Sequence, residues 1–186
     1  IVFRGVELAK KAAELFGKDK KVALDVGPTG RLFDGAGKFG FNEAYDAFAR
    51  QIKVGARAGA DFVAVETMGD LREAKAAILA AKENSSLPVL VTMTLSESGK
   101  TLTGSDIECI ASVMEGLRVD AIGFNCGFGP DKMFEYIKRL SQLVNIPIVA
   151  KPNAGLPVVR DGETAFDLTV DEFAYYASRL AEAGAS

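Results

Sequence analysis

Short apolar runs alternate along the chain with longer segments in which apolar residues recur every three or four positions. The apolar runs lie at Val22–Val26, Phe62–Val65, Val89–Met93, Ala121–Phe124 and Ile146–Ala150. Continuous apolar runs of this length are typical of parallel strands that are covered on both faces. We therefore predict parallel strands near residues 22–26, 62–66, 89–94, 121–125 and 147–151.

The segments around these runs have the periodicity of amphipathic helices. The opening stretch Val2–Phe16 is predicted to be helical, with Val6, Leu8, Ala12, Leu15 and Phe16 roughly on one side. Apolar positions at helical spacing also predict three later helices, through Ala44, Phe48, Ile52 and Ala56, through Leu71, Ala74, Ile78 and Ala81, and through Met133, Ile137, Leu140 and Val144.

Helix starts and loops carry their own signals. Asp70, Ser105 and Thr169 are each followed three positions later by a glutamate, which is the spacing of a capping box. Pro130 suits a first helical turn, and Gly59 suits a helix end. The stretch Asn153–Asp167 is predicted to be a long irregular loop.

Alternating strands and helices predict an α/β fold with a parallel sheet and right-handed crossovers. Two architectures fit, an open doubly wound sheet and a closed (β/α)₈ barrel. A whole barrel usually needs about 250 residues and eight strands. The 186 residues carry five strand–helix units, a number that by itself slightly favours the open sheet.

Composition narrows the classes of function. A net charge of -3 argues against a nucleic-acid partner, and no apolar run approaches the roughly 20 residues of a membrane span. The chain has no histidine and only two cysteines, Cys109 and Cys126, which are too far apart for a close metal-binding pair. So few cysteines favour a cytoplasmic protein.

Polar and small residues gather where each predicted strand ends, the place where ligands bind in both architectures. Glu66 ends an apolar run and either pairs within the fold or holds a cationic group such as a substrate ammonium. Cys126 is a small buried hydrophobe, a nucleophile or a zinc ligand, and zinc would lower the thiol pKa without a histidine. Cys109 lies within a predicted helix and is expected in the core.

Together these strand ends resemble the homocysteine S-methyltransferase family, most closely the homocysteine-binding barrel of its cobalamin-dependent members. The similarity rests on five motifs in matching order, Gly27-Pro28-Thr29-Gly30, Glu66-Thr67, Leu102-Thr103-Gly104, Gly123-Phe124-Asn125-Cys126 with Gly129-Pro130, and Pro152-Asn153-Ala154-Gly155. The resemblance implies that residues 1–186 are the central part of a (β/α)₈ barrel domain, an incomplete TIM-barrel type covering the third to seventh strands.

The resemblance also implies a chemistry for four residues. Cys126 would be a zinc ligand, and Glu66 would bind the homocysteine amino group. Asn153 would lie beside the metal and the substrate, and Thr29 would shape the floor of the site. The family's eighth strand carries a Gly-Gly-Cys-Cys motif that completes the zinc site and has no counterpart here, so we expect the 186-residue chain alone to bind zinc weakly and to lack activity.

The resemblance implies methyl transfer to a homocysteine thiolate, giving methionine. The methyl group would come from methylcobalamin, recharged from methyltetrahydrofolate, on cobalamin- and folate-binding domains of the same parent protein. Two alternatives stay open, a betaine- or S-methylmethionine-dependent homocysteine methyltransferase and a non-catalytic α/β domain that binds a small molecule.

Overall fold

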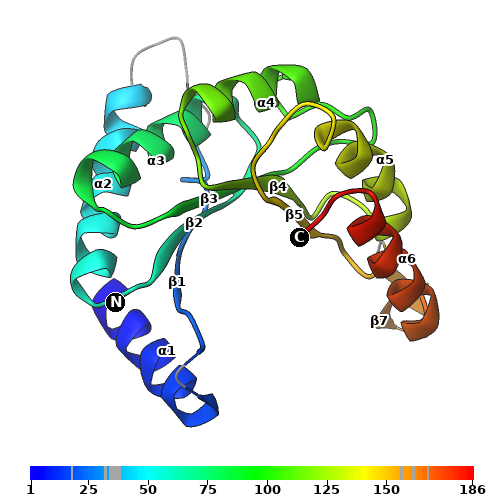
Figure 1. The fold of residues 1–186 in the computed structure, drawn as a ribbon, viewed down its shortest axis with the longest axis horizontal. Helices are drawn as coiled ribbons and strands as arrows, with labels where there is room; N and C mark the ends of the chain where they lie inside the picture. Colours follow the sequence, from blue (N-terminus) through cyan, green and yellow to red (C-terminus); the bar gives the residue numbers. More distant parts are fainter. Residues whose placement is uncertain (18, 32, 34–38, 156, 161, 167) are drawn as a thin grey trace. The chain divides into compact units, whose positions relative to one another are not determined.

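The computed structural model describes residues 1–17, 19–31, 33, 39–155, 157–160, 162–166 and 168–186. Its main sheet contains the strands β1 (Ala23–Val26), β2 (Phe62–Met68), β3 (Val89–Met93), β4 (Ala121–Asn125) and β5 (Ile148–Lys151). The helices are α1 (Val2–Phe16), α2 (Phe41–Arg57), α3 (Leu71–Asn84), α4 (Ile107–Gly116), α5 (Pro130–Leu140) and α6 (Val170–Glu182). Figure 1 shows the alternation of strands and helices, and all five predicted strands are confirmed.

The order of the strands decides between the two candidate architectures. The sheet runs β1-β2-β3-β4-β5, so spatial order follows chain order. A doubly wound sheet reverses its order at a switch point, whereas successive right-handed crossovers in one direction are the topology of a (β/α)₈ barrel. The parallel, incomplete TIM-barrel type is therefore confirmed, and the slight preference for an open sheet that the strand number gave is wrong.

The chain forms two compact units, Ile1–Val91 and Thr92–Ser186. In the first unit, α2 and α3 pack against each other and bury the apolar positions that the helical spacing predicted. Phe48, Ile52 and Ile78 are buried, and Ala56 is half-buried. Gly55 allows α2 to approach β1, because a Cβ atom at this position would lie 2.4 Å from a methyl group of Leu24.

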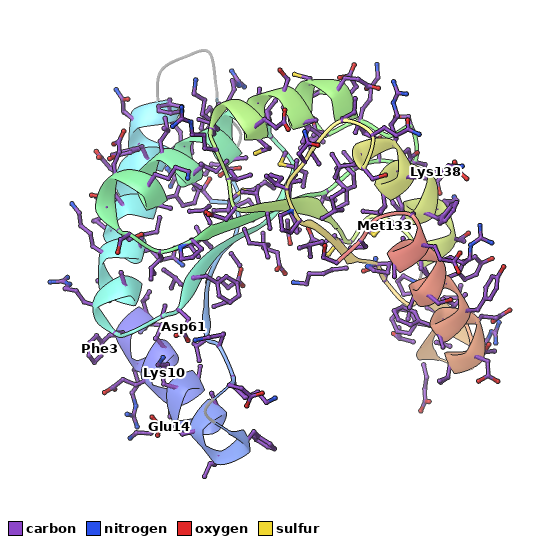
Figure 2. All side chains as sticks on the ribbon, in the orientation of Figure 1. Phe3, Lys10, Glu14, Asp61, Met133 and Lys138 are labelled. Carbon is purple, nitrogen blue, oxygen red and sulfur yellow. The ribbon has the colours of Figure 1, made fainter. Side chains whose placement is uncertain are left out.

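Helix α1 buries a different side from the one that its sequence indicated. Val6 is its buried residue, whereas Leu8, Leu15 and Phe16 are 51%, 84% and 79% exposed. With 3.6 residues per turn, Leu8 and Leu15 point away from the side that carries Val6 and Lys10. Lys10 lies on the packed side and pairs with Asp61 at 3.2 Å, as Figure 2 shows. The predicted apolar stripe on this helix is wrong.

In the second unit, α5 packs against β4, β5 and α6. Its residues Met133, Ile137 and Leu140 are buried, while Lys138 is exposed; Met133 and Lys138 are labelled in Figure 2. The helix begins at Pro130 after the N-cap Gly129, as predicted.

Of the three predicted capping boxes, the structure confirms one, and in the other two the glutamate has a different partner. The Thr169–Glu172 box that opens α6 is confirmed. Helix α4 is capped by Asp106, which accepts a hydrogen bond from the Cys109 amide at 2.9 Å, so the prediction of Ser105 as the cap is wrong. Glu108, its supposed partner, instead pairs with Arg139 at 2.6 Å.

The predicted loop Asn153–Asp167 contains a hairpin of β6 (Pro157–Arg160) and β7 (Glu163–Phe166). The strands are antiparallel, with Arg160 opposite Glu163, and Gly162 has a φ of 81°. An Asp-Gly pair between two short runs of strand-forming residues is a strong hairpin signal, and it occurs here at positions 161–162. The irregular-loop prediction is therefore wrong for these two strands; Leu156, Asp161 and Asp167 lie outside the described residues.

Across the parts of the chain that the structure describes, every helix is too short or too polar to span a lipid bilayer.

Candidate functional site

The first group of candidate residues is at the carboxyl end of the β1–β2 pair. We call it the β1–β2 edge and define it as Gly27–Gly30, Glu66 and Thr67. Val26, the last residue of β1, is level with Val65 of β2. Gly27 and Glu66 therefore lie at the same edge, one position beyond the last paired residues of β1 and β2. Glu66 is half-buried, and β2 continues beyond it to Met68, whereas the predicted strand stopped at Glu66.

Thr67 has a backbone conformation that threonine rarely adopts. Its φ is 63°, in the left-handed region. For a β-branched residue this is a genuine outlier, and such strain is concentrated at active sites and ligand clamps. The strain falls directly after Glu66, which is the residue that the sequence marked as a candidate for holding an ammonium group.

Thr29 is joined to the first turn of α3 through Glu73. Its amide donates to the Glu73 Oε1 atom at 2.8 Å, and its hydroxyl donates to the same atom at 2.6 Å. Glu73 is 5% exposed, so this is a buried carboxylate bound by two donors. The sequence predicted that Glu73 would reach back to the N-cap of α3. Asp70 is the N-cap and accepts from the Arg72 amide at 2.7 Å, but Glu73 bonds to Thr29 instead.

The second group of candidates is at the carboxyl end of the β4–β5 pair. We call it the β4–β5 edge and define it as Asn125–Gly129 and Asn153. Cys126 follows β4 directly, is half-buried and has a φ of 57°. The Asn125 amide nitrogen Nδ2 donates to its Sγ atom at 3.3 Å. The left-handed backbone fixes the direction of the thiol, and the amide places a hydrogen-bond donor against it.

The loops after β4 and β5 are tied together by backbone hydrogen bonds. The Cys126 amide donates to the Lys151 carbonyl at 3.2 Å, and the Asn153 amide donates to the Phe128 carbonyl at 3.2 Å. Gly127 has a φ of 74°, and a Cβ atom there would lie 2.5 Å from the Leu95 carbonyl oxygen. Asn153 thus lies just after β5, and Cys126 lies just after the neighbouring strand β4. The backbone bond from Asn153 to Phe128 joins the two loops two positions beyond Cys126.

Comparison with known proteins identifies the family of this chain. A sequence model described as homocysteine S-methyltransferase matches residues 1–186. The chain belongs to the homocysteine S-methyltransferase family. It is 36% identical over 192 residues to a methionine synthase of Mycobacterium leprae and 34% identical over 192 residues to one of Mycobacterium tuberculosis. Each match covers 98% of this chain, but the chain spans 16% of each relative.

Solved structures of this family have the same fold. The apo form of the homocysteine methyltransferase MmuM from Escherichia coli has a TM-score of 0.77 and 25% identity, over 99% of this chain and 64% of that chain. Its metallated form has the same TM-score and identity, over 99% of this chain and 62% of that chain. A carboxyl transferase domain of Rhizobium etli pyruvate carboxylase, at 14% identity over 98% of this chain and 28% of that chain, has a TM-score of 0.62 and shares the fold alone.

The part of this family member that the structure describes does not contain a complete metal site. No group of three or more histidine, cysteine, aspartate or glutamate side chains among its described residues could hold a metal ion. Cys126 therefore provides a single thiolate candidate. Cys109 lies exposed on α4, so the expectation that it belongs to the core is wrong. Its neighbours Ile107 and Ile110 are buried on the opposite side of the helix.

A cavity of about 270 Å³ lies beside the loop that follows β4. Phe128, Gly129 and Leu168 contribute to its lining. The Lys132 ammonium pairs with Glu97 at 2.5 Å at this cavity, and the hydrogen bond from Lys132 lowers the pKa of the Glu97 carboxyl. Phe128 and Gly129 belong to the β4–β5 edge, so the cavity adjoins that group of residues.

Proposed function

We propose that residues 1–186 form the central part of a homocysteine-binding (β/α)₈ barrel domain in a protein that methylates homocysteine to methionine. The match of the family to the whole chain carries this proposal. Similarity to two proteins named methionine synthase supports methionine as the product. Because this chain spans 16% of each of them, there is room in the parent protein for cobalamin- and folate-binding domains. We take methylcobalamin, recharged from methyltetrahydrofolate, as the methyl donor.

Cys126 is the residue that we assign to zinc. It fits this role because it is a half-buried strand-end thiol whose sulfur accepts a hydrogen bond from the Asn125 side-chain amide. A metallated form of the similar E. coli enzyme is consistent with a metal in the family. Zinc sites in proteins usually take three or four protein ligands, so the remaining ligands would come from outside this chain. Bound zinc would lower the pKa of the homocysteine thiol and supply the thiolate at neutral pH.

Glu66 and Asn153 are the residues that we assign to homocysteine. The Glu66 carboxylate would accept hydrogen bonds from the substrate ammonium group, a charge-assisted contact that fixes the amino acid end of the substrate. Asn153 would lie beside the thiol end of the substrate and the metal. The reaction forms a bond between the homocysteine sulfur and the methyl carbon, breaks the bond between that carbon and its donor, and releases the thiol proton. In this proposal the residues of this chain bind the substrate and provide one zinc ligand. The methyl donor is bound by another domain.

The test uses the complete parent protein. Methionine formation from homocysteine is measured with methylcobalamin and methyltetrahydrofolate, then with betaine, and then with S-methylmethionine. Turnover with the cobalamin donor supports the full proposal. Turnover with another donor keeps the homocysteine chemistry but overturns the choice of donor. Binding of homocysteine without turnover under any donor would favour a non-catalytic domain.

We also propose that the protein works in the reducing cytoplasm. A zinc-bound Cys126 must be a thiolate, and the exposed Cys109 thiol would be open to oxidation outside that compartment. Homocysteine and the parent protein's own domains are the partners that this chemistry requires, with neither nucleic acid nor membrane among them.

A further inference from the structure

Two carboxylates of the same strand–helix unit lie at the β1–β2 edge, and they have different surroundings. Glu66 lies in β2, and Glu73 lies seven residues later in the first turn of α3. Glu66 is half-buried at the strand end, whereas Glu73 is 5% exposed and accepts both donors of Thr29. The carboxylate at the edge and the carboxylate bound to the neighbouring loop therefore belong to the same strand–helix unit.

The bonds to Glu73 determine what Thr29 can do. The hydroxyl proton of Thr29 is donated to Glu73, and the hydroxyl oxygen accepts from the Arg31 amide at 3.3 Å. A hydroxyl has a single proton to donate, so the side chain cannot donate to a substrate while this contact is made. Both Thr29 bonds end on one atom, Glu73 Oε1. The contact needs an acceptor oxygen at that place, and it does not need a negative charge.

A second contact joins the same loop to the same helix turn. The guanidinium carbon of Arg72 lies 5.3 Å from the centre of the Phe33 ring, which is within the range of a cation–π contact. The Arg72 guanidinium also bonds to the N-cap residue Asp70 at 3.3 Å. The segment after β1 is thus held to the start of α3 at two places, Thr29 and Phe33.

We propose that Glu73 is a positioning residue that holds the Gly27–Gly30 loop against α3, so that the backbone of this loop and Glu66 together form the homocysteine-binding edge. This inference rests on the proposed function for its substrate. It also revises the role of Thr29, whose side chain holds the loop and does not contact the substrate. Glu66 acts through its charge, and Glu73 acts through the geometry of one oxygen atom.

The experiment compares matched variants of the complete parent protein. Glu73→Ala removes the acceptor, whereas Glu73→Gln keeps an amide oxygen that can take both bonds. Thr29→Val removes the hydroxyl bond and leaves the backbone amide bond to Glu73, whereas Thr29→Ser keeps both. Lys75→Ala, an exposed position on the same helix, is the control. Hydrogen exchange of the Thr29 amide, KM for homocysteine, kcat and the melting temperature are measured for each.

We expect Glu73→Ala and Thr29→Val to speed exchange at Thr29 and to raise KM for homocysteine between about tenfold and 100-fold, because small misplacements of binding groups have effects of this size. The changes in kcat should be smaller. Glu73→Gln, Thr29→Ser and Lys75→Ala should stay near wild type. The double variant Glu73→Ala/Thr29→Val should be no worse than Glu73→Ala alone, since that variant already removes both bonds from Thr29.

Three outcomes would overturn the inference. Unchanged exchange at Thr29 in Glu73→Ala would show that the contact does not hold the loop. Faster exchange and a lower melting temperature with an unchanged KM would make the contact purely structural. A Glu73→Gln variant as impaired as Glu73→Ala would show that charge matters rather than geometry. Wild-type protein that does not bind homocysteine would overturn the proposed function and the substrate role with it, while the exchange data would still decide whether Glu73 holds the loop.

Discussion

The β1–β2 edge and the β4–β5 edge differ in the contacts that hold their candidate side chains. At the β1–β2 edge, Thr29 gives both of its donors to the buried Glu73, at 2.8 and 2.6 Å. At the β4–β5 edge, the Cys126 sulfur accepts one bond from Asn125, and the described residues offer no metal-binding group of three ligands. At the first edge a candidate side chain is bound to a buried carboxylate, whereas at the second the loops are joined by backbone hydrogen bonds. If the second binds zinc, the metal and residues from elsewhere must complete it.

Both edges contain a strained residue, which is what they have in common. Thr67 and Cys126 have φ values of 63° and 57° in the left-handed region. Such residues cost about 1–3 kcal/mol each and persist where the surrounding structure holds them. In each case the strained residue is part of, or directly follows, a candidate binding residue. The two edges share this strain but differ in their contacts. We therefore expect substrate binding at the β1–β2 edge to depend on hydrogen-bond geometry, and activity at the β4–β5 edge to depend on metal content.

The largest expected effect is that of Cys126→Ala in the complete parent protein. Without this thiolate we expect zinc to be lost and methyl transfer to fall below roughly 1% of wild type, because the substrate thiol is then mostly protonated at neutral pH. The fold should be retained, since the side chain is at a strand end and only half-buried. Zinc per mole of protein and the rate of methionine formation are the measurements.

Cys109→Ala is the matched control for this variant. Its thiol is exposed on α4, so its loss should change neither zinc content nor activity. Full zinc and full activity in Cys126→Ala would remove the metal assignment, and with it the contrast between the two edges.

The second prediction concerns charge at the β1–β2 edge. Glu66→Gln keeps the shape of the side chain but removes the charge that we assign to the substrate ammonium. Hydrogen bonds to charged groups contribute about 1.5–3 kcal/mol, so KM for homocysteine should rise between about tenfold and 100-fold. Zinc content should stay at the wild-type level. A loss of zinc in this variant would contradict the separate roles of the two edges.

The sequence was sufficient to predict the strands and several helix starts, because their signals are local. Each strand of the main sheet is an apolar run, and Pro130 and the Thr169–Glu172 pair mark helix starts that the structure confirms. The hairpin of β6 and β7 was missed although its Asp-Gly signal was present. The exposed position of Cys109 could also have been predicted from the sequence, because Ile107, Ile110 and Met114 define the apolar side of its helix and Cys109 does not lie on that side.

The contact between Thr29 and Glu73 could not be predicted from local patterns. The two residues are 44 positions apart, and the spacing of Asp70 and Glu73 instead resembled a capping box. Ser105 and Asp106 are both good capping residues, and the backbone geometry selects the second. The roles of Glu66, Asn153, Thr29 and Cys126 in binding remain predictions, because each depends on a substrate or metal as well as on the fold.

The third prediction tests the Asn125 side-chain amide, which donates to the Cys126 sulfur. Asn125→Leu removes the donor at 3.3 Å, and loss of a hydrogen-bond partner around a metal ligand typically lowers affinity between about tenfold and 100-fold. Zinc affinity of the complete protein, measured by competition with a chelator, should fall toward the lower end of that range. Thr94→Val is the control, since it breaks the 3.1 Å bond from Thr94 to the Asn125 carbonyl without touching the sulfur. Equal affinities for Asn125→Leu and wild type would make the amide contact irrelevant to metal binding.

The smallest effect is expected at the opposite, amino-terminal end of the β1–β2 pair, where polar contacts should affect stability alone. The Asp61 carboxylate accepts from the Val22 amide at 2.7 Å and pairs with Lys10 at 3.2 Å, joining α1, β1 and β2. The Val22 hydrogen bond, followed by that from Lys10, lowers the pKa of Asp61. Asp61→Ala should cost roughly 1–2 kcal/mol in the opening free energy of α1, measured by hydrogen exchange near neutral pH.

The dependence of this effect on pH has a definite sign. Because the folded pKa is below the unfolded value of about 3.9, the carboxylate stabilises the fold fully above that pH and loses this contribution as the pH falls through the lowered folded value. The difference between wild type and Asp61→Ala should therefore shrink on acidification. Lys20→Ala, which removes an exposed pair with Asp19, should cost no more than a few tenths of a kcal/mol and is the control. Zinc content and KM for homocysteine should be unchanged in both variants; a change in either would mean that the amino-terminal end of these strands is coupled to the binding edge.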